Sequence, residues 1–278
     1  MTQQINTETA GLDTLHRLVH GKLGFIFDLD GTVYLGDQLV PGAADVVRLL
    51  RETGKKVAFL SNKPIASRED YARKLNRLGV GCTADEVVNS SLVLARYLQK
   101  TRPGALVFPI AEEPVITDLE RHGLRICEDP QRIEVVVVSW DRGFDYRKLD
   151  IAYNAAMRGA DLVGTNPDRT CPMPGYRLPD AACMIAAVEA CTERKVDPIV
   201  GKPSQIMLQE VLDLLNLEPD QCVVFGDRPE TDMLMAARAG LTGALVLTGV
   251  TGPDDLDHLC VRPDLVLESV ADLLPVLQ

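Results

Sequence analysis

Residues 25–33 of the chain read FIFDLDGTV. The apolar run at residues 25–27 predicts a buried strand of a parallel sheet, and Asp28 and Asp30 stand at its carboxyl end. Gly31 permits a tight turn that brings backbone amides close to whatever the carboxylates hold. Two like charges so close together cost free energy unless a cation or a reacting group offsets them, so the segment predicts a functional site.

Two aspartates in this arrangement can divide the work of catalysis. One carboxylate can attack as a nucleophile while the other transfers a proton, and both can face a hard cation such as Mg²⁺. The alternative is that Asp28 and Asp30 only cap a loop, because Asp and Gly are common turn residues. A calcium-binding EF-hand loop is excluded: counted from Asp28, Val33 stands where that loop needs Gly and Leu39 where it needs Glu.

The composition is that of a globular protein with one large or two ordinary domains. The chain has 278 residues, of which 46% are hydrophobic and 25% charged. No apolar run approaches the ~20 residues that span a bilayer, so we expect no membrane partner. A net charge of −11 argues against binding nucleic acid, whose phosphates repel an acidic surface. A small phosphate ligand stays possible, because a pocket needs only local positive charge.

The N-terminal segment and the cysteines predict a cytoplasmic protein. Residues 1–21 contain no apolar core of a secretory signal, and we expect a short tail or a leading helix there. The seven cysteines include no CxxC pair and their number is odd. This pattern favours reduced thiols over a disulfide framework or a zinc site.

Strand-like and helix-like segments alternate along the chain, which predicts an α/β fold with a doubly wound parallel sheet. Residues 91–195 carry an α/β pattern of their own and are long enough to fold as an inserted domain. We therefore expect a core domain formed by residues 1–90 and 196–278, with the inserted domain between them. Within the core, the predicted strands are 56–60, 197–201, 221–225, 243–247 and 264–267, and the predicted helices are 42–53, 67–79 and 204–215. The second of these helices begins with a sequence that resembles a capping box, Ser67 to Asp70.

Polar side chains follow the carboxyl ends of four predicted core segments, the edge where open parallel sheets bind ligands. They are Asp28 with Asp30, Ser61 with Asn62, Lys202 after the segment 197–201, and Asp227 with Asp232. Taken singly, each has a structural explanation as a turn, cap or surface residue. Together, carboxylates without His or Cys favour Mg²⁺, and a hydroxyl, an amide and an ammonium favour the oxygens of a phosphoryl group.

These motifs resemble those of the haloacid dehalogenase superfamily. The signatures are a DxDGT strand end, a Ser after the second strand, a Lys, and a GDxxxTD loop, which stand here at residues 28–32, 61, 202 and 226–232. The inserted domain resembles the large α/β cap of the class IIA branch, that of NagD-like and p-nitrophenylphosphatase-like enzymes. Residues 138–142, VSWDR, and 164–168, GTNPD, add to this likeness, and details around Ser61 and Asp168 are similar to AraL-like sugar-phosphate phosphatases.

The resemblance implies a chemical role for each catalytic position. Asp28 would attack phosphorus and form an aspartyl-phosphate, and Asp30 would protonate the leaving alcohol and then activate water. Ser61, Asn62 and Lys202 would hold the phosphoryl oxygens. The second carboxylate favours an ester phosphatase over a dehalogenase, because a departing halide needs no proton while an alkoxide does.

The resemblance also implies Mg²⁺ as cofactor. The ion would lie between Asp28, the backbone carbonyl of Asp30 and Asp227, while Asp232 would orient the surrounding ligands through water. Lys63 departs from the Asn or Ser that is usual at its position and places an extra cation near the phosphate or just outside the site.

The cap would supply substrate specificity. The candidates are Arg169, Met173 and Tyr176 in the loop 165–176, and Trp140 with Arg142 at a cap strand end. Trp140 has the alternative of being a core residue of the cap, because a single Trp often packs inside a domain. The sequence PDAA at residues 179–182 departs from the glycine-rich turn of the family, which leaves the cap geometry and a homodimer through the cap open.

The sequence thus predicts a Mg²⁺-dependent phosphatase of small phosphate monoesters, such as sugar phosphates, with p-nitrophenyl phosphate as a surrogate. A phosphotransferase or mutase of the same superfamily is the alternative among enzymes. A sugar-phosphate sensor that binds without catalysis is the alternative of another class.

Overall fold

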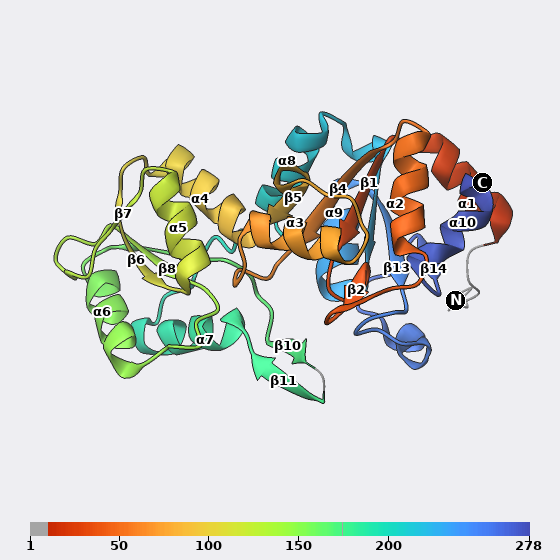
Figure 1. Cartoon of the computed structure of the whole chain (residues 1–278). Helices are drawn as coiled ribbons and strands as arrows, with labels where there is room; N and C mark the ends of the chain where they lie inside the picture. Colours follow the sequence, from red (N-terminus) through yellow and green to blue (C-terminus); the bar gives the residue numbers. More distant parts are fainter. Residues whose placement is uncertain (1–10, 174) are drawn as a thin grey trace. The chain divides into compact units, whose positions relative to one another are not determined.

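The computed structural model of the chain describes residues 11–173 and 175–278, without the side chains of residues 172 and 173 (Figure 1). These residues form two compact units. The first contains the described residues up to Ser61, together with Tyr71–Val87 and Leu208–Gln278. The second contains Asn62–Asp70 and Val88–Met207.

The first unit is built on a six-stranded sheet of order β14-β13-β12-β1-β4-β5. The strands are β1 (Gly24–Asp28), β4 (Lys56–Ser61), β5 (Val87–Asn89), β12 (Cys222–Gly226), β13 (Thr242–Val246) and β14 (Leu265–Leu267). The pairings from β14 through to β4 are parallel. The chain runs outward from β1 to β5 and later from β12 to β14, so the sheet is doubly wound, as the sequence predicts.

The hydrophobic run of the opening motif forms the centre of this sheet. All five residues of β1 are buried, as expected for a strand covered on both faces. The ring of Phe27 stacks on Phe225 of β12 at 4.9 Å between centroids and lies 6.3 Å from that of Phe59 in β4. These contacts fix the three strands that carry the sheet's central carboxyl edge.

Three helices form at the predicted places: α2 (Ala43–Glu52), α3 (Arg68–Arg77) and α8 (Gln205–Leu215). The leading segment forms α1 (Leu12–Gly21), and two further helices were not predicted, α9 (Leu234–Ala239) and α10 (Leu274–Leu277). Ser67 and Asp70 form the predicted capping box of α3, with each side chain accepting the other's backbone N–H at 3.1 Å. Shorter elements are the hairpin β2 (Tyr34–Leu35) and β3 (Gln38–Leu39), the 3₁₀ helices Ala84–Glu86, Pro219–Gln221, Pro253–His258 and Val270–Leu273, and the π-helix η3 (Pro229–Met233).

The second unit has its own parallel four-stranded sheet of order β7-β6-β8-β9. Its strands are β6 (Leu106–Ile110), β7 (Arg125–Ile126), β8 (Val135–Val138) and β9 (Asp161–Gly164). Its helices are α4 (Ser90–Thr101), α5 (Glu113–Arg121), α6 (Tyr146–Met157) and α7 (Ala181–Thr192), and β10 (Thr170–Met173) pairs with β11 (Tyr176–Pro179) in an antiparallel hairpin.

One expected strand does not form. The segment 197–201, which precedes Lys202, makes a single bridge between Ile199 and Gly164 of the second unit and does not join the core sheet. Pro198 lacks the backbone N–H that a continuous ladder would need. The place of the sixth core strand is taken by β5, which the sequence analysis did not predict.

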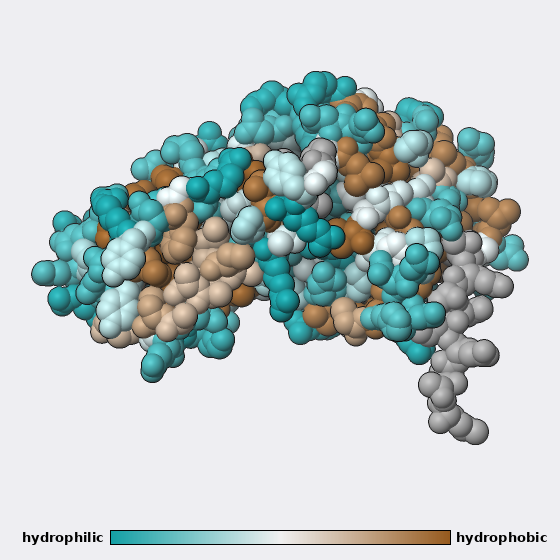
Figure 2. Space-filling model, turned by 90° about the horizontal axis from the view of Figure 1, so that it is seen from below, coloured by the Kyte–Doolittle hydropathy of each residue, from teal (hydrophilic) through white to brown (hydrophobic). Residues whose placement is uncertain are grey.

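The surface mixes hydrophilic and apolar residues, as the composition leads one to expect. On the face shown in Figure 2, hydrophilic residues are interspersed with smaller apolar patches. Every helix among the described residues is too short or too polar to span a lipid bilayer.

Candidate active site

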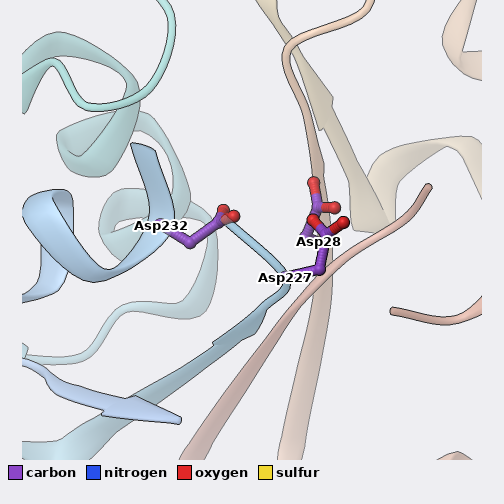
Figure 3. A group of neighbouring side chains, drawn as sticks. All are labelled: Asp28, Asp227 and Asp232. Carbon is purple, nitrogen blue, oxygen red and sulfur yellow. The ribbon is translucent and has the colours of Figure 1, made fainter. Parts of the chain in front are cut away.

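Three aspartates meet at the carboxyl edge of the six-stranded sheet (Figure 3). Asp28 ends β1, Asp227 follows β12, and Asp232 lies in η3. One carboxylate oxygen of each lies within 4.8 Å of the others, and none of the three residues is more than 8% exposed. Because β1 and β12 adjoin where the two halves of the sheet diverge, this carboxylate cluster occupies the switch point at which open parallel sheets bind ligands.

The donor set of the cluster fits a hard divalent cation. Three carboxylates at these separations repel one another when ionised, and burial weakens the screening by water. A bound cation would offset that repulsion. Carboxylate oxygens without imidazole or thiolate are the ligands that Mg²⁺ prefers. Asp28, Asp227 and Asp232 could therefore hold a metal ion.

Asp227 is fixed by the loop that follows β13. Its Oδ2 accepts the backbone N–H of Val250 at 2.6 Å, and its backbone carbonyl accepts the hydroxyl of Thr251 at 2.6 Å. The carboxylate also rests against two glycines: a Cβ on Gly31 or Gly249 would lie 2.4 or 2.0 Å from Oδ2. Only glycine fits at these two positions, so both loops are shaped around this side chain.

Asp232 is presented by an irregular turn of helix. The π-helix η3 is a rare conformation that frequently marks functional sites. Asp232 Oδ2 accepts the backbone N–H of Arg228 at 3.3 Å and the Thr231 hydroxyl at 3.4 Å. A Cβ on Gly226 would lie 2.2 Å from Asp232 Cγ, so this carboxylate too packs against bare backbone.

Asp30 contacts a tyrosine of the small hairpin. The hydroxyl of Tyr34 donates to Asp30 Oδ2 at 3.2 Å. Burial, reinforced by the negative charge of Asp30, raises the pKa of Tyr34 above its ordinary value. The phenol therefore keeps its hydrogen and remains a donor to the carboxylate.

Ser61 also contacts a tyrosine. It ends β4, is 3% exposed, and its hydroxyl donates to the hydroxyl oxygen of Tyr71 at 3.4 Å. Two buried tyrosines thus reach two of the predicted site residues, Tyr34 to Asp30 and Tyr71 to Ser61.

Within the second unit, the side chain of Asn62 is hydrogen-bonded to the backbone of Lys202. Asn62 Oδ1 accepts the backbone N–H of Lys202 at 2.7 Å, and Asn62 Nδ2 donates to the Lys202 carbonyl at 3.1 Å. The second amide hydrogen goes to Asp168 Oδ2 at 3.1 Å. The amide group of Asn62 is thus engaged by the Lys202 backbone and by Asp168.

The same network continues to the base of the β10–β11 hairpin. Asn166 Nδ2 donates to Asp168 Oδ2 at 3.0 Å and to Asp180 Oδ1 at 3.1 Å. Asp180 begins α7 by accepting the N–H of Ala181. Burial raises the pKa of Asp180 to about 6, and the nearby charge of Asp168 adds to the shift.

The hairpin carries the first set of predicted specificity residues. Arg169 is exposed beside β10, and Tyr176 at the start of β11 is 57% exposed. Met173 pairs with Tyr176 in the register of the hairpin, and its side chain lies outside the described residues.

The second set of specificity candidates lies differently. Trp140 is 1% exposed and packs in the apolar core of the second unit, with the Lys63 ammonium 5.8 Å from its ring centroid. Its burial favours the alternative interpretation of Trp140 as a core residue. Arg142 is exposed and forms a bidentate ion pair with Glu112, with both N–O distances 2.6 Å, and this pair lowers the pKa of Glu112.

Several residues around the site were not predicted from the sequence. They are Tyr34, Tyr71 and the loop residues Thr248, Gly249, Val250 and Thr251. The loop could have been found, because it follows the predicted strand 243–247 and therefore lies at the same edge as Asp227. No pattern in the sequence indicated that Tyr34 and Tyr71 contact site residues.

The matches to known families cover most of the chain. A model described as haloacid dehalogenase-like hydrolase matches residues 25–125, and a second model of HAD-like hydrolases matches residues 199–273. The first includes Asp28, Asp30 and Ser61, and the second includes Lys202, Asp227 and Asp232.

Curated relatives align along nearly their whole length. Sugar-phosphatase AraL of Bacillus subtilis is 34% identical over 90% of this chain and 91% of its own. Human glycerol-3-phosphate phosphatase is 33% identical over 91% of this chain and 90% of its own.

Solved structures share the architecture. A p-nitrophenyl phosphatase from Archaeoglobus fulgidus superposes with a TM-score of 0.87 at 33% identity, covering 91% of this chain and 98% of that one. NagD from E. coli K-12 gives 0.83 at 27% identity over 90% and 98%. The chain therefore belongs to the haloacid dehalogenase superfamily of hydrolases, in its class IIA branch of NagD-like and p-nitrophenylphosphatase-like enzymes.

Proposed function

We propose that this enzyme is a Mg²⁺-dependent phosphatase that hydrolyses small phosphate monoesters through an aspartyl-phosphate on Asp28. The observation that carries the proposal is the carboxylate cluster, in which Asp28, Asp227 and Asp232 approach within 4.8 Å at the switch point of the sheet. Buried carboxylates so arranged have an evident use only when a cation and a reacting group join them.

Two residues perform the chemistry in this proposal. A carboxylate oxygen of Asp28 forms a bond to phosphorus while the bond from phosphorus to the ester oxygen breaks, and Asp30 gives its proton to the departing alcohol. Water then attacks the aspartyl-phosphate, Asp30 takes the proton from that water, and inorganic phosphate leaves with Asp28 regenerated.

The metal and the phosphate-binding residues supply charge. Mg²⁺, held by Asp28, Asp227 and the Asp30 carbonyl, would neutralise the charge of the phosphoryl oxygens, and Asp232 would orient its remaining ligands. We assign to Ser61, Asn62 and Lys202 the holding of the transferring phosphoryl group. The bonds from Asn62 to the Lys202 backbone support a shared role for these two residues.

The proposed substrates are compact esters such as sugar phosphates. The named activities of the relatives, a sugar-phosphatase and a glycerol-3-phosphate phosphatase, support this class. We propose Arg169 and Tyr176, exposed on the hairpin of the second unit, as residues that select among esters.

Phosphate release from a panel of esters, with Mg²⁺ and with EDTA, tests the proposal. The panel contains p-nitrophenyl phosphate, sugar phosphates, glycerol phosphate, phosphoglycolate, pyridoxal phosphate and nucleotides. We expect release that requires Mg²⁺ and is abolished by Asp28→Asn. Transfer of phosphate to an acceptor alcohol without release would indicate a phosphotransferase, and binding without any turnover would indicate a sensor.

A further inference from the structure

The hydrogen bond between Tyr34 and Asp30 has no part in the chemistry proposed above. Tyr34 is only 1% exposed, and its hydroxyl lies 3.2 Å from Asp30 Oδ2. An ordinary phenol has a pKa near 10, so this hydroxyl is a donor at neutral pH and the carboxylate oxygen accepts.

Backbone hydrogen bonds of the turn hold Tyr34 next to Asp30. The N–H of Tyr34 donates to the carbonyl of Leu29 at 3.2 Å, and its own carbonyl accepts the N–H of Gly31 at 2.8 Å. Asp30 and Tyr34 also form an isolated β-bridge. These contacts close the turn of the opening motif and return the tyrosine to the aspartate four residues before it.

A cation fixes the ring from the other side. The ammonium of Lys74, in α3, lies 3.7 Å from the centroid of the Tyr34 ring, which is within the range of a cation–π contact. The ring is therefore held by its burial, by the turn and by Lys74. Its hydroxyl meets Asp30 at a fixed point.

A fixed donor on one carboxylate oxygen has a consequence for the other oxygen. Rotation about the last side-chain bond of an aspartate is otherwise broad. With Oδ2 held by Tyr34, the rotation of Asp30 is restricted and Oδ1 keeps one direction. Proton transfer to a leaving group requires such a direction, because the donor must lie within hydrogen-bond reach of the ester oxygen.

We propose that Tyr34 is the positioning residue of the general acid Asp30. Its contribution to kcat/KM is larger for esters whose leaving group must be protonated as it departs. This inference rests on the proposed phosphatase function. It assigns to Tyr34 no contact with the phosphoryl group.

Comparing kcat/KM for esters with different leaving groups distinguishes this positioning role from a merely structural one. The p-nitrophenolate anion is stable at neutral pH and departs without a proton, whereas an alkoxide must be protonated as the bond breaks. General acid catalysis contributes about 10²–10⁴-fold, and a misdirected acid forfeits a part of it. For Tyr34→Phe we expect kcat/KM to fall about tenfold for an alkyl ester such as glycerol phosphate, and by less than about twofold for p-nitrophenyl phosphate.

Ser61→Ala is the comparison variant. Ser61 is a buried residue of the same unit, at the end of β4, and is a proposed phosphate-binding residue. Ser61 would meet the phosphoryl group of every ester, so we expect Ser61→Ala to lower kcat/KM for alkyl and aryl esters by the same factor. Thermal unfolding of both variants shows whether each is folded.

Two further variants keep the proposal testable if Tyr34→Phe is poorly folded. Lys74→Met leaves the hydroxyl in place but removes the cation over the ring, and we expect a smaller loss, about threefold, again confined to alkyl esters. In an Asp30→Asn background, Tyr34→Phe is expected to cause no further loss for alkyl esters, because the acid that it positions is already absent.

The outcomes separate the two proposals. Equal losses for alkyl and aryl esters in Tyr34→Phe, or no loss for either, would overturn the positioning role while leaving the phosphatase function intact. No Mg²⁺-dependent phosphate release by the unaltered chain from any ester would overturn the proposed function, and this inference with it.

Discussion

A Cβ atom on Gly249 would lie 2.0 Å from Oδ2 of Asp227. The carboxylate of the candidate metal site therefore rests directly on the backbone of the loop after β13, whose next residue, Val250, donates its N–H to the same oxygen at 2.6 Å. Gly31, in the loop after β1, packs against the same oxygen, so residues of two separate strand-end loops fix the position of the Asp227 carboxylate.

This contact makes Gly249→Ala a sensitive probe of the site. The new methyl group must displace the Asp227 carboxylate, and a misplacement of about 1 Å in a catalytic group can cost on the order of 10²-fold in rate. We expect kcat for p-nitrophenyl phosphate to fall by about that factor. Gly21→Ala is the control, because its Cβ would meet nothing within 4 Å. Full activity in Gly249→Ala would show that catalysis does not depend on the observed position of the Asp227 carboxylate.

Removal of the metal should reveal the repulsion within the carboxylate cluster. We expect the unaltered protein in EDTA to melt at a lower temperature than in Mg²⁺, since a ligand at about 100 times its Kd adds about 2.7 kcal/mol. Asp227→Asn removes one of the three charges, so it should be more stable than the unaltered protein in EDTA and gain less from Mg²⁺. Thermal unfolding of both proteins with and without Mg²⁺ measures this. Identical melting temperatures in all four conditions would speak against a cation site.

Asn62→Ala should loosen the backbone at Lys202. The variant leaves the buried N–H and carbonyl of Lys202 without the partners that Asn62 supplies, which costs about 1–3 kcal/mol of unfolding free energy. Urea unfolding measures that loss, and phosphate release should show a raised KM. Asn154→Ala, on helix α6, serves as control, because its amide donates to Asp150 of the same helix. A loss no greater than that of the control would refute the holding role of Asn62.

Asp180 should make stability depend on pH. Its pKa is raised to about 6 by burial, against about 4 for an unfolded Asp, so the folded state favours the protonated form. Its contribution is therefore most favourable below about pH 4 and is lost as the pH rises to about 6, by on the order of 2 kcal/mol.

Asp180→Asn removes that dependence while keeping an oxygen that can accept the N–H of Ala181. The variant should gain stability relative to the unaltered protein between about pH 4 and pH 6 and hold a constant advantage above it. Urea unfolding at several pH values checks the difference. A difference that does not vary with pH would mean that Asp180 titrates alike in both states.

The core of the fold and the carboxylate cluster followed from local sequence patterns. The buried run before Asp28 is typical of a central parallel strand, and strand ends of such a sheet share an edge. Asp28, Asp227 and Asp232 are therefore brought together although they are distant in sequence. The capping box of Ser67 and Asp70 could be predicted for the same reason, because its two residues are only three positions apart in the sequence.

The remaining features depended on contacts that no local pattern encodes. The hairpin β10–β11 contains Pro172 and Pro179, which argue against strands and favour the loop that the sequence predicted. Strand β5 has three residues, too few for a periodic signal. The contact of Tyr34 with Asp30 arises from the closure of a turn, and the spacing of four residues alone does not indicate it.

The central claim is a covalent phosphate on Asp28, and trapping it is the most direct test. The protein is mixed with p-nitrophenyl phosphate and Mg²⁺, quenched rapidly, and reduced with borohydride, which converts an aspartyl-phosphate to homoserine. Peptide mass spectrometry should then find homoserine at position 28, and none in Asp28→Asn. Homoserine absent from position 28 during rapid turnover, or present at Asp30 instead, would contradict the account.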